Sequence, residues 1–144
     1  MMALVVLQMT FPGAPMIYYG DEIGMTGGND PLNRGCMIWD KSKWNMKLFD
    51  WYKLLINIHE TKPALRYGNY LPIVMDKDVL GFERTYEGQT LYVFINGGST
   101  VQKVATPLYG KFENLVNETM IGGSESGLNL VMQPYQVMIL EMSK

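Results

Sequence analysis

The sequence contains very little cysteine and histidine, and these shortages exclude several kinds of site. Its 144 residues include one cysteine and one histidine. A single cysteine cannot form an intramolecular disulfide, and it has no second thiol with which to build a zinc cluster. We therefore predict no metal site and expect Cys36 to be a buried or inert thiol.

Clustered positive charge and a long hydrophobic run are also missing. Twelve Lys and Arg residues against 14 Asp and Glu residues leave a net charge of -2, which does not favour phosphate binding. The apolar opening MMALVVLQMTF stops at Pro12, short of the ~20 residues of a membrane span. No basic residue precedes Arg34, so the positive region of a signal peptide is missing. We predict no nucleic acid, no membrane and a cytoplasmic location.

The first 40 residues nevertheless carry a clear order of elements. Residues 1–10 predict a helix packed on all sides, which two prolines and a glycine end at residues 11–15. The apolar run 16–19 predicts a strand buried on both faces, as parallel strands beneath helices are. The glycine-rich stretch 20–35 predicts a long loop, and loops of that length are usually functional.

A second helix and a set of strands follow. Apolar residues recur at helical spacing from Trp44 to Ile58, with Ser42 as the predicted N-cap and residues 61–63 as the stop. Short β-type runs then predict seven strands of an antiparallel sandwich, with 91–95 and 137–142 as central strands because they are apolar on both faces. The predicted strands are 71–75, 79–86, 90–96, 101–106, 111–117, 128–133 and 136–142. Asn117 to Thr119 is expected to be a turn rather than a glycosylated sequon.

Three stretches of the sequence resemble one enzyme family. FPGAPMIYYGDEIGMTGGNDPLNRGCMIWD, residues 11–40, closely resembles the segment with the eighth barrel strand of α-amylase family glycosidases (glycoside hydrolase family 13). The nearest branch is that of neopullulanase, cyclomaltodextrinase and maltogenic amylase. DWYKLLINIHETKPALRYGNY is similar to their last barrel helix, and VLGFERTYEGQTLYVFING to the start of their C-terminal sandwich.

The resemblance implies a mixed fold. It consists of the last strand and helix of a TIM (β/α)8 barrel, followed by an all-β antiparallel sandwich of the Greek-key type. Residues 1–66 would be the barrel remnant, comprising the end of the seventh helix, the eighth strand, the long loop and the eighth helix. Residues 70–144 would be the sandwich, so the predicted boundary lies near residues 66–70.

The resemblance also implies that the catalytic residues are absent. In the family the catalytic Asp and Glu lie on the fourth and fifth strands, and a third Asp follows an Asn-His pair; none of these motifs occurs here. The chain would begin just after the last motif. His59 is expected to be a helix-surface or packing residue. We predict no catalytic residue and an inactive chain.

The acidic pair Asp21 and Glu22 does not replace the missing residues. Retaining glycoside hydrolysis needs two carboxyl groups about 5–5.5 Å apart across the sugar. Neighbouring residues of a strand point to opposite faces, so this pair cannot flank one bond if the strand continues that far. We expect Asp21 and Glu22 to have a structural or supporting role, in which one faces the cavity while the other packs or pairs behind it.

Asp30 and Arg34 are the predicted substrate-binding residues. A carboxylate accepts hydrogen bonds from sugar hydroxyls and a guanidinium donates to them. Their match to the family's NDPxxR motif implies contact with a glucose unit on the donor side of the cleavage point; a salt bridge that only shapes the loop is the alternative. Tyr19 and Trp39 are candidates for stacking on sugar rings, whereas Tyr18 is expected in the core. Trp39 lies in MIWD, with Cys36 in place of the proline of the family's PMxWD.

The implied function is that of the C-terminal portion of a retaining glycosidase. Its substrates would be α-1,4-glucosidic bonds in starch-derived oligosaccharides, cyclodextrins or pullulan, so the expected partner is an α-glucan oligosaccharide. The alternative is a stand-alone carbohydrate-binding or assembly module. A lone barrel strand exposes unpaired edges, so residues 1–40 are expected to rearrange or to self-associate with another copy. No cofactor is predicted, and calcium binding is left undecided.

Overall fold

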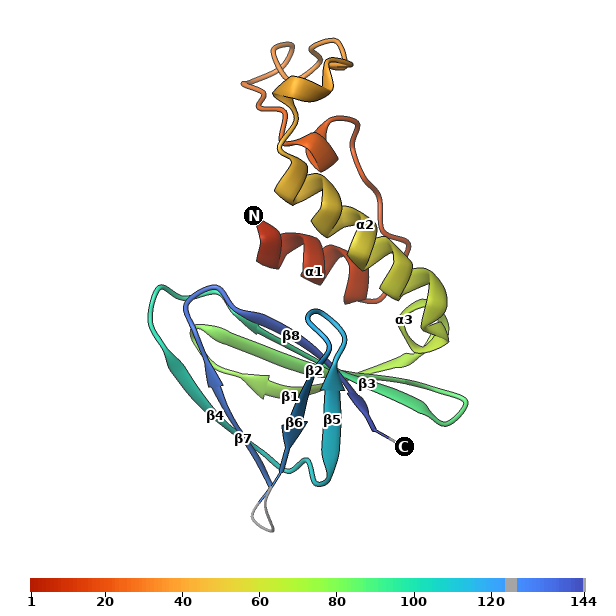
Figure 1. Cartoon of the computed structure of the whole chain (residues 1–144), viewed down its shortest axis with the longest axis vertical. Helices are drawn as coiled ribbons and strands as arrows, with labels where there is room; N and C mark the ends of the chain where they lie inside the picture. Colours follow the sequence, from red (N-terminus) through yellow and green to blue (C-terminus); the bar gives the residue numbers. More distant parts are fainter. Residues whose placement is uncertain (124–126, 144) are drawn as a thin grey trace.

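The computed structural model describes residues 1–123 and 127–143, with helices at one end and strands at the other (Figure 1). The helical elements are α1 (Met2–Thr10), η1 (Asp21–Ile23), η2 (Lys41–Lys43), α2 (Met46–Thr61) and α3 (Pro63–Tyr67). The strands are β1 (Asn69–Met75), β2 (Val79–Tyr86), β3 (Gln89–Asn96), β4 (Gln102–Thr106), β5 (Lys111–Asn114), β6 (Thr119–Gly122), β7 (Leu128–Met132) and β8 (Val137–Met142).

The strands form two antiparallel sheets. Six strands follow the order β1-β2-β3-β8-β5-β6, and β4 pairs with β7 in a second sheet. The prediction that 91–95 and 137–142 are central is confirmed, because β3 and β8 lie in the middle of the larger sheet. The predicted strand 111–117 is too long: β5 ends at Asn114, a turn occupies residues 115–118, and the chain returns as β6, which the prediction missed.

Both faces of the six-stranded sheet are buried, each in its own core. Alternate residues of β3 point to opposite sides, so Val93 and Ile95 pack beneath the helices while Phe94 packs toward the β4-β7 sheet. The helix-side core also contains residues of all three α-helices, including Val6, Leu55 and Leu65. The six-stranded sheet therefore packs against the helices on one face and against the β4-β7 sheet on the other.

Helix α1 is confirmed but is not packed on all sides. Val5, Val6 and Met9 are buried, whereas Leu4 is 68% exposed. A helix that is apolar all round needs cover on every face, and here only the face toward α2 and the sheet is covered.

The predicted buried strand 16–19 is wrong. In the described structure residues 16–18 have no regular secondary structure, Tyr19 begins a turn, and no part of the segment has a ladder partner. Tyr18 is 44% exposed instead of lying in the core. A parallel strand needs a hydrogen-bonded neighbour, and every ladder of the described residues is antiparallel and lies after residue 68. The side-chain amide of Gln8 donates to the carbonyl of Met16 instead.

Helix α2 is confirmed with a different cap. Asn45, not Ser42, is the N-cap, because its side-chain oxygen accepts from the backbone N–H of Leu48 at 3.1 Å. Ser42 lies one element earlier, in η2, where its N–H and hydroxyl donate to Asp40. The helix ends at Thr61 as predicted, and Pro63 begins the short α3.

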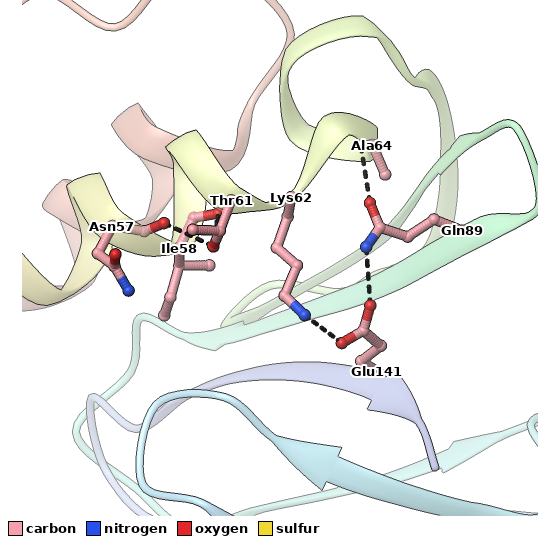
Figure 2. A network of polar contacts seen from close by, with 7 residues as sticks. All are labelled: Asn57, Ile58, Thr61, Lys62, Ala64, Gln89 and Glu141. Atoms are coloured by element: carbon pink, nitrogen blue, oxygen red, sulfur yellow. Dashed lines mark hydrogen bonds and ion pairs between the residues drawn. The ribbon is translucent and has the colours of Figure 1, made fainter. Parts of the chain in front are cut away.

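A polar network joins the α2–α3 junction to the sheet (Figure 2). Lys62 Nζ lies 2.5 Å from Glu141 Oε2, and both side chains are partly buried. Gln89 Nε2 donates to Glu141 Oε1 at 2.8 Å, while Gln89 Oε1 accepts from the N–H of Ala64 at 3.1 Å. The network therefore ties the helices to β3 and β8.

Arg84 makes a second connection, on the inner face of β2. Its side chain is 1% exposed; Nη1 donates to the carbonyl of Thr10 at 2.5 Å and Nη2 to that of Gly68 at 3.0 Å. These carbonyls lie at the C-terminal ends of α1 and α3, where helix dipoles concentrate negative charge. Burial lowers the pKa of Arg84. The boundary near residues 66–70 stays a prediction, although contacts cross it here.

Candidate functional site

The loop that contains the predicted site lies beyond the N-terminal end of α2, at the far end of the molecule from the sheets (Figure 1). Its first part is the turn η1, in which Ile23 is buried. The carbonyl of Ile23 accepts from the N–H of Asn45 at 3.0 Å. The start of the loop is therefore fixed to the start of α2.

Asp30 and Arg34 form an exposed ion pair within the loop. Arg34 Nη2 lies 2.5 Å from Asp30 Oδ2, and the two side chains are 66% and 58% exposed, respectively. An exposed pair of this kind contributes little to stability, because water and salt screen it. Both side chains are open to a ligand, and the alternative of a pair that only shapes the loop stays open.

Tyr18 and Tyr19 lie next to a small cavity of about 180 Å³ in the same loop. Leu32 and Asn33, which lie between Asp30 and Arg34 in the sequence, also line it. The cavity is smaller than the ~300–1,000 Å³ of pockets that enclose a small-molecule ligand.

The Tyr19 side chain is held against the end of the loop. Its hydroxyl donates to the carbonyl of Gly35 at 3.0 Å, and its ring centroid lies 4.6 Å from that of Tyr18. The hydrogen bond with Tyr18, followed by desolvation, raises the pKa of Tyr19. The hydroxyl and the ring of Tyr19, a predicted stacking residue, are thus both in contact with neighbouring residues of the loop.

The strand geometry considered for Asp21 and Glu22 does not apply, because the chain does not continue as a strand. The two residues lie in the 3-10 turn η1, where Glu22 Oε2 accepts from the N–H of Gly20 at 2.8 Å. Asp21 lines a cavity of about 310 Å³ together with Tyr52. Burial, then the charges of Asp21 and Glu22, raise the pKa of Tyr52. Their supporting role behind a substrate stays a prediction.

Trp39 and Cys36, which follow the Asp30–Arg34 pair in the sequence, are both exposed. Trp39 is 79% exposed, which leaves its ring available for stacking. Cys36 is exposed as well, so of the expected buried or inert thiol the burial is wrong, and its inertness stays a prediction. Among residues 1–123 and 127–143, no three His, Cys, Asp or Glu side chains are grouped so that they could hold a metal ion.

His59 behaves as expected for a packing residue. Its Nδ1 lies 2.8 Å from the carbonyl of Met9, which links α2 to the end of α1. Sequence reasoning missed the buried Arg84, although Arg84 lies two residues after Phe82 on β2 and so shares its buried face. In the part of the chain that is described, no helix is long and apolar enough to cross a membrane.

Comparison with known proteins assigns both halves of the chain to one family. Residues 1–61 match the family model "Alpha amylase, catalytic domain", and residues 72–139 match "Maltogenic Amylase, C-terminal domain". A cyclomaltodextrinase of Thermoanaerobacter pseudethanolicus is 37% identical over 94% of this chain and 23% of its own length. Neopullulanase 2 of Thermoactinomyces vulgaris is 38% identical over 94% of this chain and 24% of its own.

Solved structures show the same relationship. The α-amylase of Geobacillus thermoleovorans superimposes with a TM-score of 0.91 at 25% identity, over 99% of this chain and 33% of its own. The maltogenic amylase of S. marinus does so with a TM-score of 0.80 at 31% identity, over 97% of this chain and 19% of its own.

The chain is therefore built from sequence and structure shared by enzymes that are named as amylases. It belongs to the α-amylase family of glycosidases, glycoside hydrolase family 13, and its relatives there include cyclomaltodextrinase, neopullulanase and maltogenic amylase. It spans about a quarter of the length of these curated relatives.

Proposed function

We propose that the chain serves as the C-terminal portion of a retaining glycosidase that hydrolyses α-1,4-glucosidic bonds in starch-derived oligosaccharides, cyclodextrins or pullulan. The observation that carries this proposal is the exposed Asp30–Arg34 pair, within the part of the chain that matches a catalytic-domain model. In this proposal residues 16–19, which pair with no strand among the described residues, and α2 take the sequence positions of the eighth strand and helix of a barrel, and the sandwich is of the Greek-key type.

The chemistry of the pair suits one glucose unit. Asp30 offers acceptor oxygens and Arg34 offers donors, so together they match the vicinal hydroxyls of a neutral sugar. The exposed rings of Tyr19 and Trp39 would supply apolar contact to the same chain of sugars. We do not assign a nucleophile or general acid to any of these residues, and the chain alone is proposed to be inactive.

Asp30→Ala is expected to weaken binding of maltoheptaose at least about tenfold, because it removes charge-assisted acceptors and leaves Arg34 unpartnered. NMR titration of the ¹⁵N-labelled chain, followed at the amides of residues 24–40, measures this. For a partial site we expect a Kd of about 1 mM. Reducing-sugar assays of the same samples are expected to detect no hydrolysis.

Asp50→Ala is the matched control, because Asp50 is an exposed carboxylate on α2. Asp50→Ala should leave the shifts that maltoheptaose causes at the loop amides unchanged. If Asp30→Ala binds as well as the parent chain, the pair only shapes the loop and the proposal fails.

The second candidate is a stand-alone carbohydrate-binding or assembly module. It is favoured by the larger sheet, whose two faces are both covered within this chain. A micromolar Kd for maltoheptaose would favour such a module over a partial subsite, because a partial subsite supplies only some of the contacts.

We further propose that the 144-residue chain self-associates through the outer face of α1. Met1, Leu4 and Met16 are exposed there, beside an apolar groove of about 520 Å³ lined by Leu4, Phe11 and Met16 among others. A second copy would present the same apolar face, and a net charge of -2 opposes the contact only weakly. In a longer polypeptide the additional catalytic-domain residues would cover this face instead.

Leu4→Glu is expected to convert the dimer into a monomer in sedimentation velocity experiments at about 100 μM, because it buries a charge at the contact. Val131→Glu is the control, since Val131 is also exposed but lies on β7. A parent chain that sediments as a monomer would overturn this proposal.

We also propose a cytoplasmic location; two Bacillus subtilis relatives are named intracellular maltogenic amylases.

A further inference from the structure

A pair of tyrosines projects from the opposite end of the helical layer. Tyr67 ends α3 and Tyr86 ends β2; their ring centroids are 5.5 Å apart and the rings are inclined by 49°. Tyr67 is 62% exposed, while Tyr86 is partly buried against the helix-side core. The pair therefore presents aromatic surface to solvent on a fixed base.

Charged groups flank the two rings. The guanidinium carbon of Arg66 lies 5.1 Å from the centre of the Tyr67 ring. On the other side, the hydrogen bond with Glu87, followed by the charge of that carboxylate, raises the pKa of Tyr86. Aromatic surface is thus bordered by both a donor and an acceptor of strong hydrogen bonds.

Glu87 occupies a backbone conformation that its residue type disfavours. Tyr86 pairs with Gln89, so Glu87 and Gly88 form a two-residue hairpin turn, with φ of 45° and 82°. Turns with positive φ at both positions favour Asn-Gly or Gly-Gly, and glutamate there is strained. Strained residues cluster at binding sites, where the side chain has a use that offsets the cost.

This cluster is separate from the Asp30 loop. The loop lies beyond the N-terminal end of α2, whereas the β2–β3 hairpin lies near α3, after the C-terminal end of α2 (Figure 1). A helix of 16 residues is ~24 Å long. One glucose unit cannot contact both places.

We propose that Tyr67, Tyr86 and Glu87 form a second contact site for a neutral oligosaccharide. The rings pack against the apolar face of a sugar, the Glu87 carboxylate accepts from its hydroxyls, and Arg66 donates to them. The choice of an α-glucan as the ligand rests on the function proposed above. The competing explanation is that the tyrosines only pack α3 onto the hairpin.

The test is an NMR titration of the full chain with maltoheptaose. Amides of residues 64–68 and 86–89 are expected to shift, and Tyr67→Ala should weaken the affinity derived from them at least about fivefold. Tyr109→Ala is the control, because Tyr109 is similarly exposed. Hairpin amides that do not shift would overturn the proposal, and so would a Tyr67→Ala variant that binds as well as the control.

Glu87→Asn separates binding from packing. Asparagine suits the turn, so the thermal midpoint should rise by a few degrees, while loss of the carboxylate weakens binding at the hairpin. A higher midpoint with unchanged hairpin affinity would overturn the role of Glu87. If maltoheptaose shifts the amides of the Asp30 loop but not those of the hairpin, only the second site is refuted. If it shifts the hairpin amides but not those of the loop, only the proposed function is refuted.

Discussion

Arg84→Ala is expected to lower the free energy of unfolding by about 3–5 kcal/mol, one of the two largest effects predicted for this chain. The substitution leaves the carbonyls of Thr10 and Gly68 without their donors and opens a cavity beneath the helices. Each buried acceptor that loses its partner costs about 1–3 kcal/mol. Urea unfolding followed by far-UV circular dichroism measures the loss.

Two further variants identify the cause. Arg84→Met keeps most of the volume and removes the buried charge, whose Nε has no hydrogen-bond partner among the described residues. The free energy of unfolding should therefore fall clearly less than in Arg84→Ala. Arg66→Ala removes an exposed arginine and should cost less than about 1 kcal/mol. A cost for Arg84→Ala as small as that for Arg66→Ala would show that Arg84 does not hold α1 to the sheet.

Phe94→Ala is expected to cost about 3–5 kcal/mol and to destabilise the helices together with the sheets. Phe94 is fully buried between the sheets, on the face of β3 that points away from the helices. Because β3 also carries Val93 and Ile95 in the helix-side core, loss of the sheet removes the support of α1 and α2. We therefore expect one cooperative transition.

The three tryptophans make this measurable, because Trp39, Trp44 and Trp51 all lie before the predicted boundary. In Phe94→Ala the midpoint of the unfolding transition followed by tryptophan fluorescence should move to lower urea concentration by as much as the midpoint followed by circular dichroism. Phe82→Ala is the matched control on the helix side, where Phe82 is equally buried. If Phe94→Ala moves only the dichroism transition, residues 1–66 and 70–144 unfold as separate domains.

The candidate site was predictable as a set of residues, but not as an arrangement. The NDPxxR pattern located Asp30 and Arg34, and the structure brings them into contact. Nothing in the local pattern indicated that Asp21 and Glu22 would lie in a 3-10 turn, because that turn depends on the contact between Ile23 and Asn45. The Tyr67–Tyr86 pair joins residues from two elements, so spacing along the chain does not reveal it.

Local chemistry by itself determined the two long helices, most strands and the central place of β3 and β8. Periodicity and breaker residues act within a few positions, so these features need no knowledge of distant partners. The relationship to α-amylases was likewise present in short motifs.

Only the tertiary structure decided which apolar segments are covered. Residues 16–19 have the composition of a buried strand, yet a strand exists only where another pairs with it, and here none does among the described residues. Tyr18 and Cys36 are exposed for the same reason, because no other segment covers them. Arg84 is buried because its hydrogen-bond partners, 74 and 16 positions away, are brought to it by the fold. Burial and pairing belong to the whole chain, whereas periodicity belongs to each segment alone.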